Sequence, residues 1–181
     1  MSQVNTAQPA KPDSAAAHPA ADALRLAMRR VASTVALITV RHEGVNHGVA
    51  ATAVSSVSME PPSMLVVLNT SASALAPLLA GGRFCINFLS EKQEPLSRLF
   101  GSKAAREERF RSGTWIEEQD YVSLDGAQAR AFCVLRETLR YGTHVICVGE
   151  AERVLAADPV NPLIYLDGRY FGAARCAAPG A

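Results

Sequence analysis

The chain has 181 residues, of which 49% are hydrophobic and 19% are charged, and its formal net charge is +1. This length predicts a single domain with a sizeable core, and the composition is typical of a compact folded protein. Most of the 18 basic residues are arginines scattered along the chain, so no basic patch indicates a nucleic-acid partner. The near-neutral charge also argues against general attraction to an anionic membrane.

The four cysteines are Cys85, Cys133, Cys147 and Cys176, and they show neither a CxxC spacing nor a close spacing to histidine. Three of them lie in apolar runs, where a free cysteine packs as a small hydrophobe. We therefore expect no structural metal site and no disulfide framework. No charge-free apolar run is long enough to span a membrane, and the N-terminus has no signal-peptide pattern, so we expect a cytoplasmic protein.

Residues 1–20 are rich in Ala, Pro and Ser, and such a segment buries too little apolar surface to order itself. We therefore expect a disordered tail, followed by one domain over residues 21–175. Asp22 is a suitable N-cap for a helix that begins at Ala23. Three apolar residues then recur at helical spacing and indicate a face that covers the core: Leu24, Met28 and Val31.

Most of the remaining chain is predicted to be β-structure, because β-branched and apolar runs alternate with turn residues. We expect helices over 74–80 and within the charged segment 90–111, where Ser90 and Gln93 fit a capping box, and an irregular segment over 115–124. The expected strands cover 35–40, 48–54, 64–68, 83–89, 129–140, 143–154 and 163–166. Six or seven strands with peripheral helices favour an antiparallel barrel over a doubly wound sheet.

The stretch 48–73 (GVAATAVSSVSMEPPSMLVVLNTSAS) ends each of its two apolar runs in a cluster of hydroxyl residues. Small Gly and Ala residues allow a ligand close to the backbone, and hydroxyls with free amide N–H groups bind phosphate without a fixed positive charge. We interpret this stretch as the wall and phosphate cradle of a flavin site. The alternative is two ordinary strands with a serine-rich connection, because hydroxyl residues are common in turns.

The motifs of several enzyme classes are absent. The sequence contains no GxGxxG, no GxxxxGK[ST] and no GxSxG, so neither a Rossmann site, a P-loop nor an α/β-hydrolase nucleophile is indicated. The turn HEGVNH resembles the HExxH motif of zinc proteases, but His42 and His47 are five residues apart and Gly44 disfavours a helix between them. The polar residues in the strand runs are mostly Ser, Thr and Asn with one His, which suits a cofactor that brings its own reactivity.

Five segments occur in a characteristic order and at characteristic intervals: AATAVSSVSMEPPSMLVVLN, RFCINFLSEKQEPLSRLFG, EERF, GTHVICVGE and PLIYLDGRYF. Over residues 23–172 the sequence resembles the small flavin reductases of two-component monooxygenases, most closely the reductases of 4-hydroxyphenylacetate and pyrimidine monooxygenases. The resemblance implies a mainly β, FMN-binding split β-barrel of antiparallel Greek-key type with peripheral helices, forming a homodimer. It also implies an NAD(P)H:flavin oxidoreductase that uses NADH or NADPH, binds FMN or FAD near the dimer interface, and releases reduced flavin to a separate oxygenase.

The resemblance further implies roles for particular residues, carried over by motif. Those along the isoalloxazine and ribityl chain are Thr52, Ala53, Val54, Ser55 and Ser56, and those at the phosphate are Asn69, Thr70, Ser71 and Ser73. Asn87 and Leu89 approach the flavin from the next strand. His144 lies where the nicotinamide meets the flavin and orients it, because hydride passes directly between the two rings and alignment supplies most of the catalysis.

Several of these residues have an alternative, structural interpretation. Arg109 and Phe110 close over the flavin or the pyridine nucleotide, or else Phe110 packs a helix end into the core. Tyr170 stacks near the site or is plain packing at a strand end. Asn87 contacts the flavin or satisfies backbone groups within a buried strand, and a lone histidine such as His144 is often an ordinary strand residue.

Ala50 and Ala53 depart from the family pattern, in which the first position often carries Thr and the second a small or hydroxyl residue. A lost hydroxyl removes a hydrogen bond worth about 0.5–1.5 kcal/mol, so we expect an altered flavin affinity or an altered preference between FMN and FAD. Two other functions remain open. One is a flavin- or heme-binding barrel without turnover; the other is a pyridoxamine-phosphate oxidase-like enzyme, disfavoured because the stretch 48–73 contains no Arg or Lys.

Overall fold

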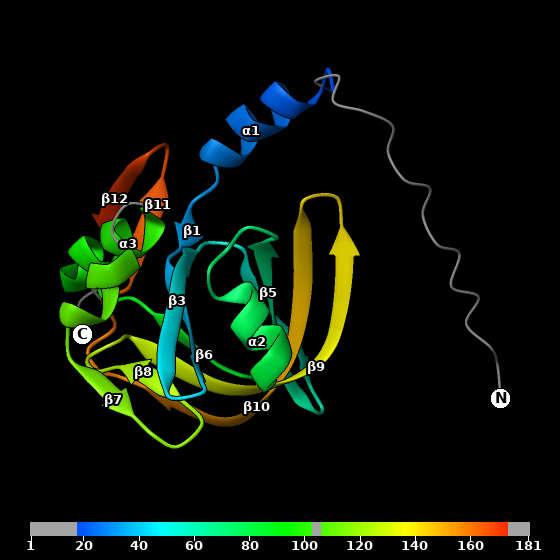
Figure 1. Cartoon of the computed structure of the whole chain (residues 1–181). Helices are drawn as coiled ribbons and strands as arrows, with labels where there is room; N and C mark the ends of the chain where they lie inside the picture. The colour runs from blue at the N-terminus through cyan, green and yellow to red at the C-terminus, as the bar shows by residue number, and fades with distance from the viewer. Residues whose placement is uncertain (1–17, 103–105, 174–181) are drawn as a thin grey trace, which may run out of the picture.

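The computed structural model describes residues 18–102 and 106–173. Its main element is an antiparallel seven-stranded sheet with the order β3-β2-β6-β9-β10-β5-β4 (Figure 1). The strands of this sheet are β2 (Ala36–His42), β3 (Val45–Ala51), β4 (Val54–Met59), β5 (Pro62–Asn69), β6 (Arg83–Phe88), β9 (Ala129–Tyr141) and β10 (His144–Ala156). The mainly β, antiparallel fold expected from the sequence is confirmed.

Two small sheets and three α-helices complete the described fold. One sheet pairs β1 (Ser33–Thr34), β11 (Leu163–Leu166) and β12 (Arg169–Gly172), and the other pairs β7 (Trp115–Glu117) with β8 (Val122–Leu124). The helices are α1 (Ala21–Arg29), α2 (Leu75–Gly81) and α3 (Glu94–Gly101), with 3₁₀ turns η1 (Glu91–Gln93) and η2 (Arg106–Arg111) beside α3. Within the described residues, no helix has the length and apolar character needed to cross a membrane.

The structure corrects two element predictions. The segment 115–124, expected to be irregular, contains the β7–β8 hairpin. The expected strand over 48–54 is interrupted at Thr52 and Ala53, where β3 ends and β4 has not begun. The charged segment 90–111 is helical as expected, forming η1, α3 and η2. The expected capping box is also present, since the Ser90 amide donates to Gln93 Oε1 at 3.0 Å.

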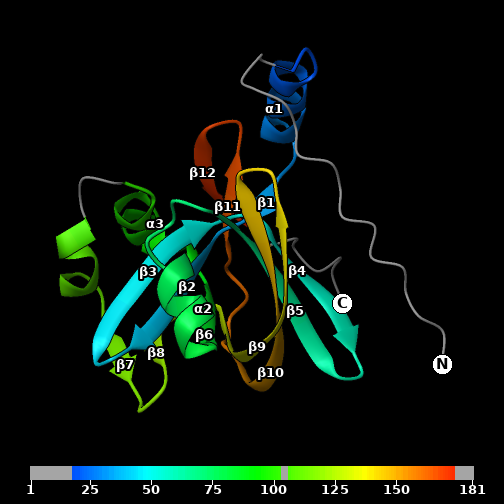
Figure 2. The ribbon, with the colours of Figure 1, turned by 45° about the vertical axis from the view of Figure 1, so that its right-hand side comes forward.

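The central strands bend the sheet until its two edges approach each other. β9 and β10 are 13 residues long, and their register shifts near Gly149 and again before Arg153; such bulges bend a strand pair. At Gly149 an added Cβ would lie 2.5 Å from the Phe84 ring, so glycine allows the bent strand to pass close to the core. As a result the edge strand β3 lies near β5 (Figure 2), and the gap between them is the seam of the barrel.

Alternating residues of β2 supply two hydrophobic cores, because both faces of this central strand are covered. Ile38 and Val40 point into the first core, which lies between the sheet and α2 and includes Leu78 and Phe84. Leu37 points into the second core, which lies under α3. Its other fully or almost fully buried members include Leu89, Phe100, Leu124 and Leu163.

Helix α1 stands away from both cores (Figure 1). It has no buried residue, and Leu24, Met28 and Val31 are 62%, 55% and 51% exposed. The prediction that its apolar face covers the core of the same chain is therefore wrong. Its described anchor is Arg29, whose Nε donates to Asp167 Oδ1 in the β11–β12 turn at 3.2 Å. Cys176 and residues 1–17 of the predicted tail lie outside the described residues.

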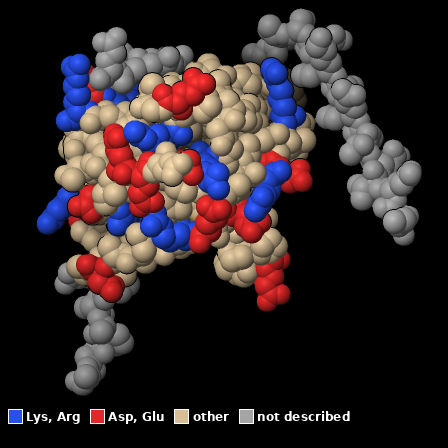
Figure 3. Space-filling model, turned by 60° about the horizontal axis from the view of Figure 1, so that its bottom comes forward, with Lys and Arg blue, Asp and Glu red and all other residues tan. Residues whose placement is uncertain are grey.

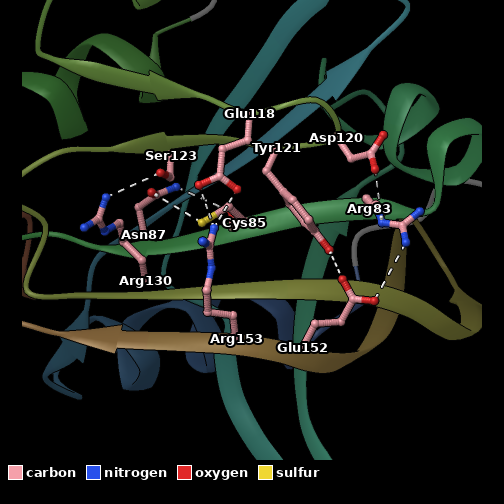
Figure 4. Close-up of polar contacts among 10 residues, drawn as sticks. All are labelled: Arg83, Cys85, Asn87, Glu118, Asp120, Tyr121, Ser123, Arg130, Glu152 and Arg153. Carbon is pink, nitrogen blue, oxygen red and sulfur yellow. Dashed lines mark hydrogen bonds and ion pairs between the residues drawn. The ribbon is translucent and has the colours of Figure 1, made fainter.

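The surface near β7 and β8 carries intermingled charges of both signs (Figure 3). Figure 4 shows several of the ion pairs, such as Arg153 with Glu118 at 2.7 Å and Arg83 with Glu152 at 3.7 Å. These side chains are partly exposed, and such pairs contribute only about 0–1 kcal/mol each. The charges neutralise one another locally, in agreement with the absence of a basic patch in the sequence.

Candidate functional site

The seam contains a cavity of about 540 Å³, which we call the seam cavity. Small side chains of residues 49–53, from the end of β3 and the bend before β4, form one wall. The opposite wall comes from the end of β5 and the start of β10. Its main residues are Val67, Leu68, Asn69, Ala72 and His144. The cavity thus lies where the sheet fails to close.

The outer edge of β3 presents backbone polar groups to this cavity. The Gly48 carbonyl points outward, since it accepts hydrogen bonds from Arg109 Nη1 at 2.6 Å and from Ser73 Oγ at 3.2 Å. Backbone groups two residues apart on a strand point the same way, so the amide and carbonyl of Ala50 also face outward. Because Ala50 and Ala51 have small side chains, a flat ligand can approach these groups closely.

A lobe of about 250 Å³ continues the seam cavity and shares Val49, Asn69 and Ala72 with it. It is lined by hydroxyls of Ser71 and Ser73 and by the guanidinium of Arg109, and we call it the hydroxyl lobe. Arg109 is 4% exposed, and its Nη1 donates to Ser73 Oγ at 2.9 Å. The predicted phosphate cradle therefore includes a buried cation that the stretch 48–73 does not itself supply.

His144 reaches the seam cavity through the register of β10. It is the first residue of that strand and pairs with Asn69 on β5 and Tyr141 on β9, so the side chains of these three residues lie on one face. The imidazole is exposed, and its Nδ1 lies 3.0 Å from Thr143 Oγ1. This places a hydrogen-bonding ring at the cavity mouth.

Tyr170 lines a smaller cavity of about 140 Å³, which shares residues 50–52 with the seam cavity. The structure thus brings together around one seam many of the residues predicted for the site. They are Thr52, Ala53, Asn69, Ser71, Ser73, Arg109, His144 and Tyr170.

Other predicted residues lie outside the linings of these three cavities: Val54, Ser55, Ser56, Thr70, Asn87, Leu89 and Phe110. Ser55 and Ser56 are exposed on β4, and Leu89 is 1% exposed in the second core. Phe110 packs against Phe100 and Trp115, with ring centroids 5.3 and 4.8 Å away. For Phe110 the structure therefore matches the packing interpretation.

The side chain of Asn87 also has a structural role, since it bonds to backbone groups of neighbouring strands. It is fully buried on the face of β6 that β8 covers, near Cys85 and Ser123 (Figure 4). Its Nδ2 donates to the Leu37 carbonyl at 3.0 Å, and its Oδ1 accepts from the Leu124 amide at 2.7 Å. These bonds join β2, β6 and β8, which is the alternative that the sequence left open, and the side chain points away from the seam cavity.

Sequence reasoning missed part of the cavity wall. Val49 and Ala51 line it; they lie within the stretch 48–73 that we interpreted as the wall, but the residues named by motif there were 52–56. The break at Thr52 and Ala53 turns the next residues away from the seam. Val67 and Leu68 also lie within that stretch without being named as site residues, and their place in the wall depends on the curvature of the sheet.

The three buried cysteines, Cys85, Cys133 and Cys147, are not suited to act as nucleophiles. Burial raises the pKa of Cys147 to about 11 and that of Cys133 to about 12, and it also raises the pKa of Cys85. These thiols are protonated at neutral pH and therefore unreactive. In the described part of the chain, no group of three or more His, Cys, Asp or Glu side chains is arranged to hold a metal ion.

Comparison with known proteins identifies the family. The model of the flavin reductase like domain matches residues 28–174. The chain belongs to the flavin reductase family. The resemblance seen in the sequence is thereby confirmed. The seam cavity and the two cavities that adjoin it are lined by some of the residues for which the resemblance implied a role.

Named relatives of this family agree in sequence and fold. The FMN reductase (NADH) RutF of Methylorubrum populi is 39% identical over 151 residues, covering 83% of this chain and 75% of the relative. The reductase component of the FADH(2)-dependent resorcinol hydroxylase of a Rhizobium species is 38% identical over 152 residues, covering 82% and 85%. The solved structure of BorF, the flavin reductase component of a bacterial two-component tryptophan halogenase, superposes with a TM-score of 0.77 at 26% identity, covering 83% and 96%.

Proposed function

We propose that this protein is an NADH-dependent flavin reductase that binds flavin in the seam cavity and supplies reduced flavin to a separate oxygenase. The observation that carries the proposal is the convergence on one cavity of a small-residue strand edge, a cationic hydroxyl lobe and a histidine. Family membership supports it, as do the names of the relatives, which include an NADH-dependent FMN reductase and a hydroxylase reductase component.

The residues present fit a flavin. A flat ring system with polar edges requires a close backbone, which the edge of β3 at Ala50 and Ala51 offers. A phosphate requires hydrogen-bond donors and positive charge, and Ser71, Ser73 and Arg109 line the adjoining lobe. When bound, the flavin supplies a two-electron acceptor for the hydride of a reduced nicotinamide.

We assign His144 the orientation of the nicotinamide. The exposed ring lines the seam cavity, and Thr143 Oγ1 lies 3.0 Å from its Nδ1. A hydrogen bond from His144 would hold the nicotinamide in position for hydride transfer to a bound flavin. In such a transfer alignment accounts for most of the rate enhancement.

We also propose that the protein is a homodimer. The face of the sheet that carries His144 is apolar: Leu139 is 57% exposed and Tyr141 69% exposed, and the residues paired with them extend the patch. We call this face the outer apolar face; its apolar residues are Leu65, Val67, Leu139, Tyr141, Ile146 and Val148, and the exposed Glu137, which pairs with Val148, lies on the same face. A contiguous exposed apolar patch is typical of an interface, and a second copy bound here would border the seam cavity.

The names of the relatives favour NADH over NADPH and FMN as the flavin for this chain, while the relation to a FADH(2)-dependent hydroxylase keeps FAD as an alternative. The cytoplasmic location expected from the sequence stays a prediction. Transfer of reduced flavin to the oxygenase requires release, which suits the open seam cavity.

Steady-state oxidation of NADH and NADPH in the presence of FMN, FAD and riboflavin tests the proposal. We expect NADH consumption that depends on added flavin and saturates with it, fastest with NADH and FMN. Saturable flavin binding without NADH consumption would favour the non-catalytic flavin-binding alternative instead. Absence of both would overturn the proposal.

A further inference from the structure

Arg109 is fixed at the hydroxyl lobe by acceptors from separate segments of the chain. Its Nη1 donates to the Gly48 carbonyl on β3 at 2.6 Å and to Ser73 Oγ at 2.9 Å, and its Nη2 donates to the Ser102 carbonyl at 2.6 Å. The guanidinium is a rigid planar fork, so it meets these acceptors in one position only. The place of this cation in the lobe therefore depends on how closely η2 approaches the edge of β3.

Gly48 allows this close approach because it has no side chain. An added Cβ at Gly48 would lie 2.5 Å from Phe100 Cε1 and 3.2 Å from Phe110 Cζ, so both rings lie directly on the strand. Phe110 follows Arg109 in η2, which links the position of its ring to that of the guanidinium. The ring and the cation thus dock at the same residue of β3.

The Phe110 ring also contacts Trp115, the only tryptophan of the chain. Their centroids are 4.8 Å apart, and Phe100 lies 5.3 Å from Phe110 and 5.4 Å from Trp115. We call these three rings the aromatic clamp. The indole Nε1–H donates to the Ser112 carbonyl at 2.8 Å, and Trp115 pairs with Leu124 of the second core. Strand β7 therefore anchors the aromatic clamp to that core.

Trp115 lies outside the linings of the seam cavity and the hydroxyl lobe, so it acts on a ligand through its neighbours. Removing the indole leaves a void beside Phe110, and the surrounding side chains relax partly into such a void. Arg109 then moves with Phe110 relative to the Gly48 carbonyl. A binding group must be held within about 0.5 Å of its productive position, so a small displacement of this cation weakens a phosphate contact.

We propose that Trp115 is a positioning residue, which holds Arg109 in the hydroxyl lobe through Phe110 and thereby sets the preference of the site for phosphorylated over unphosphorylated flavins. The identity of the ligand rests on the proposed function, whereas the position of Arg109 does not. The aromatic clamp thus makes a specificity determinant of a residue outside the ligand cavities.

The binding arm of the test measures the ratio of the riboflavin Kd to the FMN Kd, since only FMN carries a phosphate. Trp115→Leu should lower this ratio about fivefold, because it displaces a hydrogen-bonding cation without removing it. Trp115→Phe keeps an aromatic ring beside Phe110 and should restore most of the ratio. In the Arg109→Leu background, Trp115→Leu should leave the ratio unchanged, since the effects of groups that act as one unit do not add.

Two results of the binding arm would overturn the inference: an unchanged ratio in Trp115→Leu, or an equal fall of the ratio in the wild-type and the Arg109→Leu backgrounds. Ile116→Ala is the matched control and should keep the wild-type ratio, because Ile116 is 37% exposed and lies on the other face of β7. If Trp115→Leu does not fold, Gly48→Ala is measured in its place with the same expectation, since the added Cβ displaces both phenylalanine rings.

Labelling with phenylglyoxal, read by peptide mass spectrometry, needs no flavin and separates failure of this inference from failure of the proposed function. Arg109 is 4% exposed and should be protected in the wild type. Trp115→Leu should label it at least about fivefold faster, because the reagent reaches a buried group only through local opening. The Arg25 side chain, 71% exposed, should react equally in both proteins.

Equal protection of Arg109 in the wild type and in Trp115→Leu would contradict the positioning role. If the wild type binds neither flavin while the labelling of Arg109 still responds to Trp115→Leu, the proposed function fails and the positioning role stands.

Discussion

The polar residues of the site reach the seam from separate parts of the chain, and each does so for a local reason. His144 is the first residue of β10 and shares a face with Asn69 because the two are directly paired. Arg109 comes from η2 and bonds to the outward carbonyl of Gly48 because β3 is an edge strand. Single substitutions at these positions therefore test single roles.

Replacing His144 by alanine should lower kcat/KM for NADH about tenfold or more while Kd for FMN stays near the wild-type value, because misplacing a reactant by about 1 Å can cost as much as 100-fold. Thr143→Val removes the partner of His144 Nδ1 and should cause a smaller loss of the same kind. Steady-state kinetics and flavin titration measure both effects. A silent His144→Ala variant would contradict the orientation role.

Replacing Arg109 by leucine should weaken FMN binding more than riboflavin binding, because only FMN carries a phosphate. Hydrogen bonds to charged groups contribute about 1.5–3 kcal/mol, so the ratio of the two affinities should fall about tenfold or more. Arg109→Lys keeps the charge and should change the ratio less. An unchanged ratio in Arg109→Leu would show that the phosphate lies elsewhere; the ratio is informative even if the variant is less stable.

At the residue scale, the sequence indicated which residues could belong to the site better than it indicated the face of the strand on which each side chain lies. His144, Asn69 and the serines of the hydroxyl lobe were identified from motifs, and they line the seam cavity and the lobe that adjoins it. Asn87 occurs in an equally suggestive motif, yet the pleat turns it to the other face of β6, where it bonds to Leu37 and Leu124. A shift of one residue along a strand reverses a side chain, and no motif resolves that shift.

Among the elements, the β2–β3 hairpin and α2 together support the first core. His47 on β3 is half-buried and lines a surface cavity with Ala76, Pro77 and Ala80 of α2. Burial lowers the pKa of His47 below its usual 6.5, and His42 nearby lowers it further. The folded state therefore favours the neutral ring.

The lowered pKa of His47 predicts that the stability of the protein depends on pH. Below pH 6.5 the unfolded chain binds a proton at His47 that the folded protein resists, so the free energy of unfolding should fall as the pH drops from 6.5 towards the lower folded-state pKa. Above 6.5 the full contribution is present. Denaturant titrations across this range should give a shallower pH dependence for His47→Gln than for the wild type. Equal dependences would contradict the assignment.

The main strands and α2 were predictable at this scale because apolar runs, Gly and Pro mark them in the sequence. The β7–β8 hairpin was missed, since Trp115 to Leu124 has too few β-branched residues to stand out, and its pairing depends on packing under β6. The break at Thr52 and Ala53 was missed for the opposite reason: the residues on both sides of it favour strands equally.

At the scale of the whole molecule, two exposed apolar surfaces have no partner within the described chain. The outer apolar face and the exposed stripe of α1 leave many large hydrophobic side chains in solvent, including Leu24 at 62% and Tyr141 at 69%. The sequence gives no measure of such exposure, because alternation in a strand looks the same whether a face meets its own core or a partner. The homodimer implied by the family resemblance therefore stays a prediction.

Sedimentation or light scattering should give the mass of a dimer for the wild type. Leu139→Arg places a charge in the centre of the outer apolar face and should shift the protein to the monomer, because a buried unpaired charge is costly. Val160→Arg, at a 68% exposed position away from this face, should remain dimeric. A monomeric wild type, or a dimer unaffected by Leu139→Arg, would contradict the proposed interface.

The most direct test of the account is a comparison of FMN titration and FMN-dependent NADH oxidation in Thr52→Trp and the wild type. Thr52 is exposed and lines the seam cavity, so an indole there fills the cavity without disturbing either core. The account predicts saturable FMN binding and FMN-dependent NADH oxidation in the wild type and in Val160→Trp, and at least a tenfold loss of both in Thr52→Trp. Normal flavin affinity and normal turnover in Thr52→Trp would contradict the placement of the flavin in the seam, and absence of both activities in the wild type would contradict the proposed function itself.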